Sequence, residues 1–85
     1  MRRFSLFFSC EAVAALAAIP VRRRLTLFNF MEAITLFPYD GEELPGEGRK
    51  QPTFTRCFGE WRVVWWVDMP VGEVQVLLID RRHRR

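Results

Sequence analysis

Apolar residues recur along the chain with two spacings, which predict where strands and helices lie. Phe4 to Phe8 is short and aromatic, as is typical of a strand. Ser9 then offers a helix N-cap, and the Ala-rich residues 11–18 predict a helix, because Ala is the best helix former. Glu11 lies in its first turn, where the helix dipole favours an acid. A strand followed by a helix is therefore predicted for the first 18 residues.

A second helix is predicted over residues 20–37, because Pro20 suits a first helical turn and Pro38 ends the pattern. Three arginines, residues 22–24, crowd its start, where they oppose the helix dipole. A solvated helix start and a surface that faces RNA or a protein partner both remain open. The apolar residues at helical spacing form one wide stripe: Leu27, Phe30, Met31, Ile34 and Phe37.

Residues 39–51 are predicted to form a loop, because Gly, Pro and acidic residues dominate them. Three strands are predicted after it, over residues 53–58, 61–68 and 73–80, with tight turns between them. Both faces of the middle strand are largely apolar, which favours a central position in a sheet with helices on one side. Its two faces alternate as Trp61, Val63, Trp65 and Val67 against Arg62, Val64, Trp66 and Asp68.

The order of these elements predicts an α+β fold: an N-terminal strand, a helical hairpin, and then a three-stranded antiparallel meander. A length of 85 residues allows one domain, residues 1–85, with a basic tail at 81–85. A hydrophobic content of 49% argues against disorder. The positive charge is concentrated in residues 49–85, where eight Arg or Lys face four acids. Arginine suits phosphate binding, although a solvated basic surface is an equal alternative.

Neither a metal site nor a membrane span is predicted. Cys10 and Cys57 lack the spacing of a zinc or redox motif, so they are interpreted as free thiols in a reducing cytoplasm. The arginines and aromatic residues at the N-terminus imitate a secretory signal, but Glu11 interrupts the apolar run. No apolar run approaches the roughly 18 residues of a membrane span. We therefore expect a cytoplasmic protein without a cofactor.

Six segments stand in one order along nearly the whole chain: Phe8-Ser9, Glu11-Ala12, Leu16-Ala17-Ala18-Ile19-Pro20, Phe37-Pro38, Gly59-Glu60-Trp61-Arg62-Val63-Val64-Trp65 and Val76-Leu77-Leu78-Ile79. Together they resemble the RelE/ParE superfamily of type II toxin–antitoxin toxins, in which the corresponding segments have the same order. The resemblance implies a cytoplasmic toxin held inactive by a cognate antitoxin. It also implies one of two targets, because RelE-like members cut mRNA in the ribosomal A site and ParE-like members inhibit DNA gyrase.

The resemblance also implies roles for individual residues. Arg62 matches an arginine that contacts the scissile phosphate in the nuclease branch. Near the C-terminus, Arg82 matches a basic residue after the last strand in one register, and His83 matches a catalytic histidine in another. Glu47 stands for a possible loop carboxylate base. The remaining expected RNA-binding residues are Arg49, Lys50, Arg56, Arg81 and Arg84.

The residues themselves favour RNA over DNA as a substrate. One histidine, no metal spacing and no assembled Ser/His/Asp set leave DNA hydrolysis without a nucleophile. RNA supplies its own 2′-hydroxyl, so the protein need only position the phosphate, move a proton and stabilise charge. Arg62, Arg82 and His83, with Arg56 nearby, meet that requirement. Whether His83 acts as base or acid stays open.

Three functional hypotheses follow: a ribosome-dependent, metal-independent mRNA endoribonuclease, a ParE-like gyrase inhibitor without catalytic activity, and an inactive antitoxin-binding remnant. The nuclease requires the guanidinium of Arg62 to project into a cationic pocket formed with the terminal residues. A buried carboxylate that neutralises Arg62 would contradict it, and so would a position of Arg62 and the terminal residues on opposite sides of the molecule. Asp68 or Glu60 could pair with Arg62 structurally. The three tryptophans of the middle strand are expected in the core and the antitoxin interface, with base stacking as the alternative.

Overall fold

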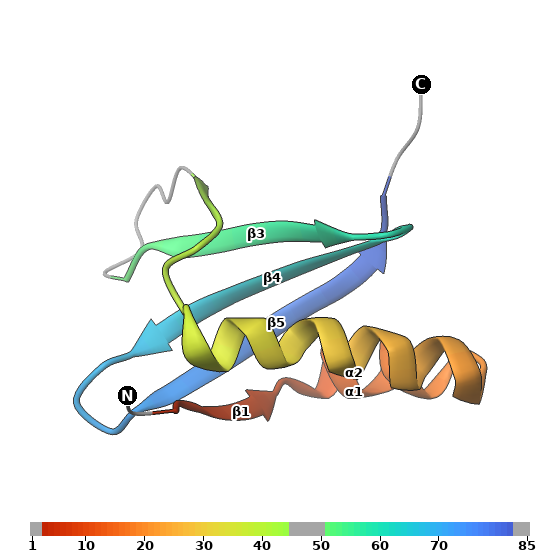
Figure 1. Ribbon diagram of the computed structural model, residues 1–85, viewed down its shortest axis with the longest axis horizontal. Helices are drawn as coiled ribbons and strands as arrows, with labels where there is room; N and C mark the ends of the chain where they lie inside the picture. The colour runs from red at the N-terminus through yellow and green to blue at the C-terminus, as the bar shows by residue number, and fades with distance from the viewer. Residues whose placement is uncertain (1–2, 45–50, 83–85) are drawn as a thin grey trace.

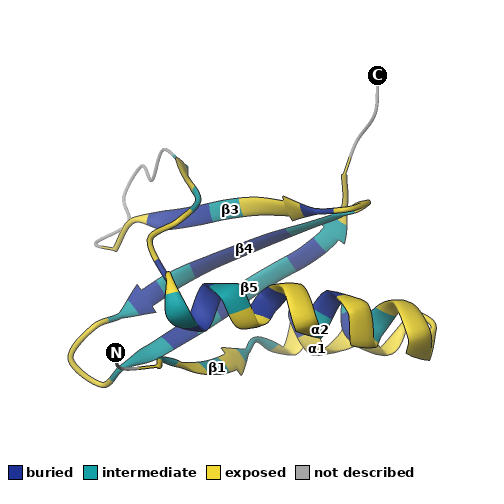
Figure 2. Ribbon diagram, in the orientation of Figure 1, coloured by how far each residue is buried: buried dark blue, intermediate teal, exposed yellow. Residues whose placement is uncertain are grey.

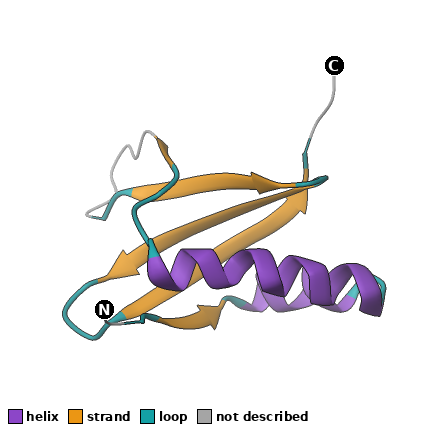
Figure 3. Ribbon diagram, in the orientation of Figure 1, coloured by secondary structure: helices purple, strands orange, loops and turns teal. Residues whose placement is uncertain are grey.

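The computed structural model describes residues 3–44 and 51–82, and it has the predicted α+β architecture (Figures 1 and 3). Two helices lie against a five-stranded sheet. The elements in chain order are β1 (Ser5–Phe8), α1 (Cys10–Ala17), α2 (Val21–Leu36), β2 (Glu42–Leu44), β3 (Thr53–Phe58), β4 (Trp61–Asp68) and β5 (Glu73–Arg81).

The sheet has the strand order β1-β5-β4-β3-β2, so β4 is central as predicted. The meander of β3, β4 and β5 is antiparallel, whereas β1 pairs with β5 in parallel. Gly59 and Gly72 occupy the two turns of the meander with φ angles of 61° and 69°. Glycine adopts this left-handed region without the steric cost that a Cβ atom brings. These two turns set the register in which β4 meets its neighbours.

The predicted loop over residues 39–51 was wrong in one part, because Glu42–Leu44 forms the edge strand β2. This strand pairs antiparallel with Thr53–Thr55 of β3. Its local sequence is acidic and shows no strand pattern, so the pairing comes from the free edge of β3 and not from intrinsic propensity. Both helices keep their predicted positions, with bounds one residue away from those predicted.

The core lies between α2 and the sheet (Figure 2). Leu27, Met31 and Ile34 of the predicted stripe are buried there. Phe30 and Phe37 are 46% and 52% exposed, so the buried stripe is narrower than predicted. The sheet contributes several side chains that pack against α2 and α1: Phe54, Val63, Trp65, Val67, Val74, Val76 and Ile79.

The strand register gives the sheet two distinct faces. The helix face contains the core residues of β4, which are Val63, Trp65 and Val67. The other face is called here the Arg62 face. A register shift between Val64 and Trp65, opposite Leu78 and Val76, keeps the alternation of β5 in step with β4. Paired side chains on the Arg62 face come from three strands: Thr53, Thr55 and Cys57 of β3, Arg62, Val64, Trp66 and Asp68 of β4, and Glu73, Gln75, Leu78 and Asp80 of β5.

Candidate functional site

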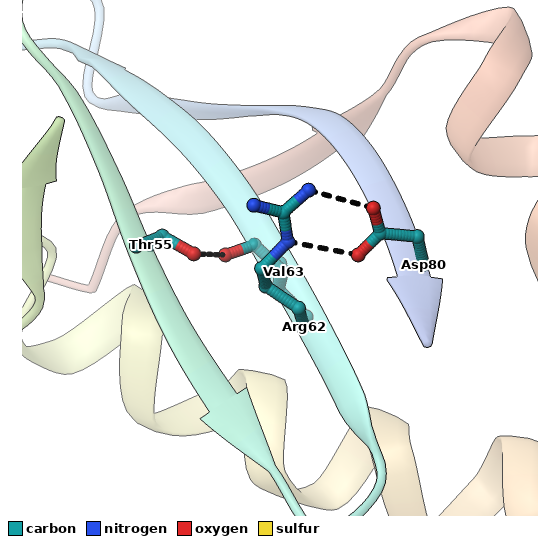
Figure 4. A network of polar contacts seen from close by, with 4 residues as sticks. All are labelled: Thr55, Arg62, Val63 and Asp80. Atoms are coloured by element: carbon teal, nitrogen blue, oxygen red, sulfur yellow. Dashed lines mark hydrogen bonds and ion pairs between the residues drawn. The ribbon is translucent and has the colours of Figure 1, made fainter. Parts of the chain in front are cut away.

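Arg62 is held by Asp80, the residue directly opposite it on β5 (Figure 4). The Nε of Arg62 donates to Oδ1 of Asp80 at 2.9 Å, and Nη2 donates to Oδ2 at 2.6 Å. Two parallel charge-assisted hydrogen bonds of this kind fix the orientation of both groups. The side chains are 37% and 33% exposed, so the ion pair lies at the surface and is not buried.

Asp80 was not among the partners that the sequence suggested for Arg62. Asp68 lies at the far end of β4, opposite Glu73, and Glu60 contacts Arg23 at 3.3 Å. The hydrogen bond to Asp80 is the largest cause that raises the pKa of Arg62 above its ordinary value, so the guanidinium stays charged. Its charge is balanced by a half-exposed carboxylate, which reduces its pull on a phosphate without blocking access to it.

One edge of the Arg62 guanidinium keeps its hydrogen-bonding capacity. A guanidinium has five N–H groups, and Asp80 takes one from Nε and one from Nη2. Figure 4 shows the third nitrogen, Nη1, on the side away from Asp80 and toward Thr55 of β3. Nη1 makes no hydrogen bond with the residues that the structure describes. The Nη1 edge of Arg62 is therefore available to a ligand on this face.

Arg56 and Arg81 lie on the helix face, in register with core residues of β4, so the structure does not bring them together with Arg62. Arg56 pairs with Val63 and Arg81 with Trp61. The guanidinium of Arg56 lies 5.2 Å from the centroid of the Phe58 ring and 3.5 Å from a carboxylate oxygen of Asp40. The guanidinium of Arg81 lies 5.5 Å from the Trp61 ring centroid. The contacts of Arg56 with Phe58 and of Arg81 with Trp61 are cation–π interactions.

Arg82 follows the last residue of β5, two residues beyond Asp80 in the sequence. Its backbone N–H donates to the carbonyl oxygen of Glu60 at 2.7 Å, which fixes this end of β5 beside the turn between β3 and β4. Arg82 lines a hollow of about 390 Å³ together with Gly59, Glu60 and Arg81. The other predicted site residues lie outside the described residues, and their roles stay predictions: Glu47, Arg49, Lys50, His83 and Arg84.

A larger hollow, of about 710 Å³, lies over the Arg62 face beside Trp66. The three tryptophans have separate environments, since Trp65 is fully buried, Trp61 lies on the helix face, and Trp66 is half-buried over this hollow. The start of α1 borders the hollow because Ser9 caps α1 and bonds to β5. The lining residues are Ser9, Cys10, Glu11, Gln51, Thr53, Trp66 and Leu77. Sequence reasoning missed this hollow, because it depends on the long-range contact between Ser9 and Leu77.

The helix side of the molecule has an apolar area, where α2 meets the turn between β3 and β4. The ring of Phe30 stacks on that of Phe58 with centroids 5.6 Å apart. These rings, with Trp61 and Arg23, line a hollow of about 390 Å³. Further apolar side chains are exposed along α2, among them Val21 and Leu25. Exposed apolar groups that cluster in this way commonly mark a surface for a protein partner.

The arginines at the start of α2 have different roles. Arg22 and Arg23 are exposed, and Arg23 contacts Glu60. The Nη2 of Arg24 donates to the carbonyl oxygens of Ile19 at 2.9 Å and Ala17 at 3.4 Å. Arg24 therefore caps the C-terminal end of α1, where a cation is favourable. It has a structural role that the sequence did not indicate.

The described residues contain no group of three or more His, Cys, Asp or Glu side chains that could hold a metal ion. Cys10 and Cys57 are free and exposed, and Cys57 lies opposite Arg62 on β3. Neither helix of the described chain has the length and apolar character needed to cross a membrane.

No protein-family model matches the sequence, and no curated protein matches it significantly. The fold, however, matches solved structures. A chain of the toxin–antitoxin complex RelBE2 from Mycobacterium tuberculosis is similar with a TM-score of 0.80 and 23% identity, over 94% of this chain and 99% of that one. The archaeal RelE–RelB complex from Pyrococcus horikoshii gives a TM-score of 0.67 and 22% identity, over 98% and 99% of the two chains. The isolated RelE toxin of E. coli gives 0.76 and 15%, over 96% and 87%.

Proposed function

We propose that this chain, which has the fold of the RelE toxin structures, is the toxin of a type II toxin–antitoxin system. In this proposal it is a cytoplasmic, ribosome-dependent mRNA endoribonuclease that a cognate antitoxin neutralises. The supporting observation is the position of Arg62, whose guanidinium stands half-exposed on the central strand with its Nη1 edge available. The sequence resemblance assigns a phosphate contact to this same residue.

The chemistry that this site allows is transesterification within the RNA. The 2′-oxygen forms a bond to the adjacent phosphorus, and the bond from that phosphorus to the 5′-oxygen of the following nucleotide breaks. The 2′-oxygen loses a proton and the departing 5′-oxygen gains one, so the products are a 2′,3′-cyclic phosphate and a 5′-hydroxyl. Arg62 binds a phosphate oxygen through its Nη1 edge and stabilises the charge that develops there. Arg82 adds positive charge at the same end of β5. The proton-transfer residue is proposed to be His83, with Glu47 as the alternative base.

The antitoxin is proposed to cover the apolar area on the helix side, where Phe30, Phe58 and Trp61 line a hollow. Aromatic side chains of this kind contribute strongly to protein interfaces. Arg23 and Arg81 flank the rings, so an antitoxin segment with apolar and acidic side chains would complement the surface. A short acidic reading frame next to the gene is the expected source of this partner.

A second candidate function is favoured by the ion pair itself. Asp80 balances the charge of Arg62, and Asp68 and Glu73 add two further carboxylates to the Arg62 face. A face with this balance is poorly suited to RNA unless other cations approach it. The candidate is therefore an antitoxin-binding protein that has the toxin fold and no nuclease activity.

The decisive experiment is induced expression of the wild-type chain and of Arg62→Ala, with mapping of mRNA 5′ ends on ribosomes. The nuclease proposal predicts growth arrest with cuts in A-site codons, and the loss of both in Arg62→Ala. Arg22→Ala is the matched control, because Arg22 is exposed at the start of α2. It should arrest growth like the wild type.

Other outcomes point to the alternatives. Growth arrest with an SOS response and blocked DNA supercoiling, without mRNA cuts, would indicate inhibition of DNA gyrase. Normal growth together with stable binding of the product of the neighbouring gene would indicate the second candidate function, an antitoxin-binding protein without nuclease activity.

A further inference from the structure

We propose that Asp80 is a positioning residue for Arg62: it selects the guanidinium edge that meets the RNA phosphate and weakens capture of that phosphate. This inference rests on the proposed nuclease function. It assigns a role in RNA binding to a carboxylate on the Arg62 face that the sequence did not single out.

The geometry carries the positioning part of the inference. Asp80 accepts hydrogen bonds from Nε and Nη2 at 2.9 and 2.6 Å, so the side chain of Arg62 cannot rotate about its terminal bonds without losing both. Arg62 and Asp80 are cross-strand neighbours on β4 and β5, so the backbone pairing of these strands fixes the separation of their Cα atoms. The third guanidinium nitrogen, Nη1, then lies on the side toward β3 (Figure 4).

The charge of Asp80 carries the second part. A phosphate on the Nη1 edge would meet a guanidinium whose charge is already balanced, and it would lie near a second anion. Both groups are partly exposed, so water screens the repulsion but does not remove it. For two anions roughly 6 Å apart, effective dielectric constants between about 40 and 80 predict a weakening of RNA binding by about three- to tenfold. Asp80 therefore lowers the affinity of Arg62 for the RNA phosphate while it fixes the orientation of the guanidinium.

The test is a double-mutant cycle on RNA binding with Asp80→Asn, Arg62→Ala and the double variant. The probe is a fluorescent single-stranded 2′-O-methyl RNA, which cannot be cleaved, and the readout is anisotropy at constant salt. Asp80→Asn is expected to tighten binding about three- to tenfold in the wild-type background and to have a smaller effect in the Arg62→Ala background, where no guanidinium holds the phosphate beside Asp80. Asp68→Asn is the matched control, because it removes a carboxylate of the same face about 20 Å along β4 from Arg62.

A second measurement separates positioning from charge alone. In single-turnover cleavage on programmed ribosomes, Asp80→Asn should cut bound RNA about tenfold more slowly despite its tighter binding, because a misplaced group loses transition-state contacts. Asp80→Glu, which keeps the carboxylate, should restore part of the rate. Thermal unfolding of every variant verifies that the fold is intact.

The outcomes distinguish this inference from the proposed function. A coupling between Asp80 and Arg62 in RNA binding, without cleavage by the wild type, would support the phosphate-capture role of Asp80 and refute the nuclease. Cleavage by the wild type with equal effects of Asp80→Asn and Asp68→Asn would overturn the inference and leave the nuclease standing. Absence of RNA binding by every variant, together with no cleavage by the wild type on programmed ribosomes, would overturn both.

Discussion

The indole Nε1 of Trp65 donates a hydrogen bond to the carbonyl oxygen of Pro38 at 2.8 Å, and both residues are buried. The bond ties the centre of β4 to the segment that leaves α2, so it joins the sheet to the helix that covers it. An unpaired buried carbonyl costs free energy because it has given up its hydrogen bonds to water.

Replacing Trp65 by Phe removes this donor and leaves a cavity, so we expect the free energy of unfolding to fall by about 2–4 kcal/mol. Urea denaturation followed by circular dichroism measures the loss. Trp66→Phe is the control, since Trp66 is half-buried over the hollow and its indole makes no hydrogen bond with the described residues. A loss in Trp66→Phe as large as that in Trp65→Phe would show that the bond to Pro38 has no special weight.

Gly41 lies against the same indole. A Cβ atom on Gly41 would stand 2.8 Å from Cη2 of Trp65 and 3.0 Å from the carbonyl oxygen of Thr55. Gly41→Ala should therefore destabilise the protein by about 1–3 kcal/mol through overpacking. In a Trp65→Phe background the outer indole ring is absent, so the added cost of Gly41→Ala should shrink. Additive losses in the double variant would contradict this explanation.

Ser9 connects α1 to the sheet through two hydrogen bonds. Its Oγ accepts from the backbone N–H of Ala12 at 3.0 Å and donates to the carbonyl oxygen of Leu77 at 2.8 Å. Ser9→Ala should lower the free energy of unfolding by about 1–2 kcal/mol, the usual cost of a lost N-cap. Ser5→Ala is the control, because Ser5 is exposed in β1 and should change stability by less than about 0.5 kcal/mol. Partial recovery in Ser9→Thr would confirm that the hydroxyl carries the effect.

The helices and the meander could be predicted because their signals are local. Alternating apolar residues and a glycine turn gave the bounds of β3 and β4 correctly, and Ser9 marked the start of α1. The edge strand Glu42–Leu44 could not be predicted, because it exists only through its pairing with β3. Local composition carries no signal for such a strand.

The partner of Arg62 was missed for a related reason. Arg62 lies directly across from Asp80 only because of the turn before β5 and the register shift after Val64. A change of register by one residue would put Asp80 on the other face of the sheet. The sequence contains the two residues but does not fix this register. The same argument explains why Arg56 and Arg81 were grouped with Arg62, although the register places them on the helix face.

Arg24 provides a test of capping by a side chain from another helix. Arg24→Ala removes the donor to Ile19 and Ala17 at the end of α1, so we expect a loss of about 1 kcal/mol in unfolding free energy. Arg22→Ala should be neutral or slightly stabilising, because it relieves an exposed cation at the start of α2. Equal losses in the two variants, measured by urea denaturation, would refute the capping role.

The two faces of the sheet give opposite expectations for the basic residues in RNA cleavage. The side chain of Arg62 lies on one face of the sheet, whereas Arg56 and Arg81 lie over aromatic rings on the helix face. If RNA binds on the Arg62 face, Arg62→Ala should slow single-turnover cleavage about 100- to 1,000-fold, the usual cost of removing a group that stabilises transition-state charge. Arg56→Ala and Arg81→Ala should each cause a much smaller loss, since a sheet separates their guanidinium groups from the phosphate.

For binding of a partner on the helix side, we expect Arg81→Ala to have a larger effect than Arg62→Ala. Arg81→Ala should weaken binding of the product of the neighbouring gene, because it removes a cation beside Trp61. Arg62→Ala should leave that binding within about twofold, since the two sites lie on different faces. Isothermal titration with both variants provides the measurement. Strong loss of partner binding in Arg62→Ala would place the partner on the Arg62 face, where it would neutralise the protein by covering the ion pair directly.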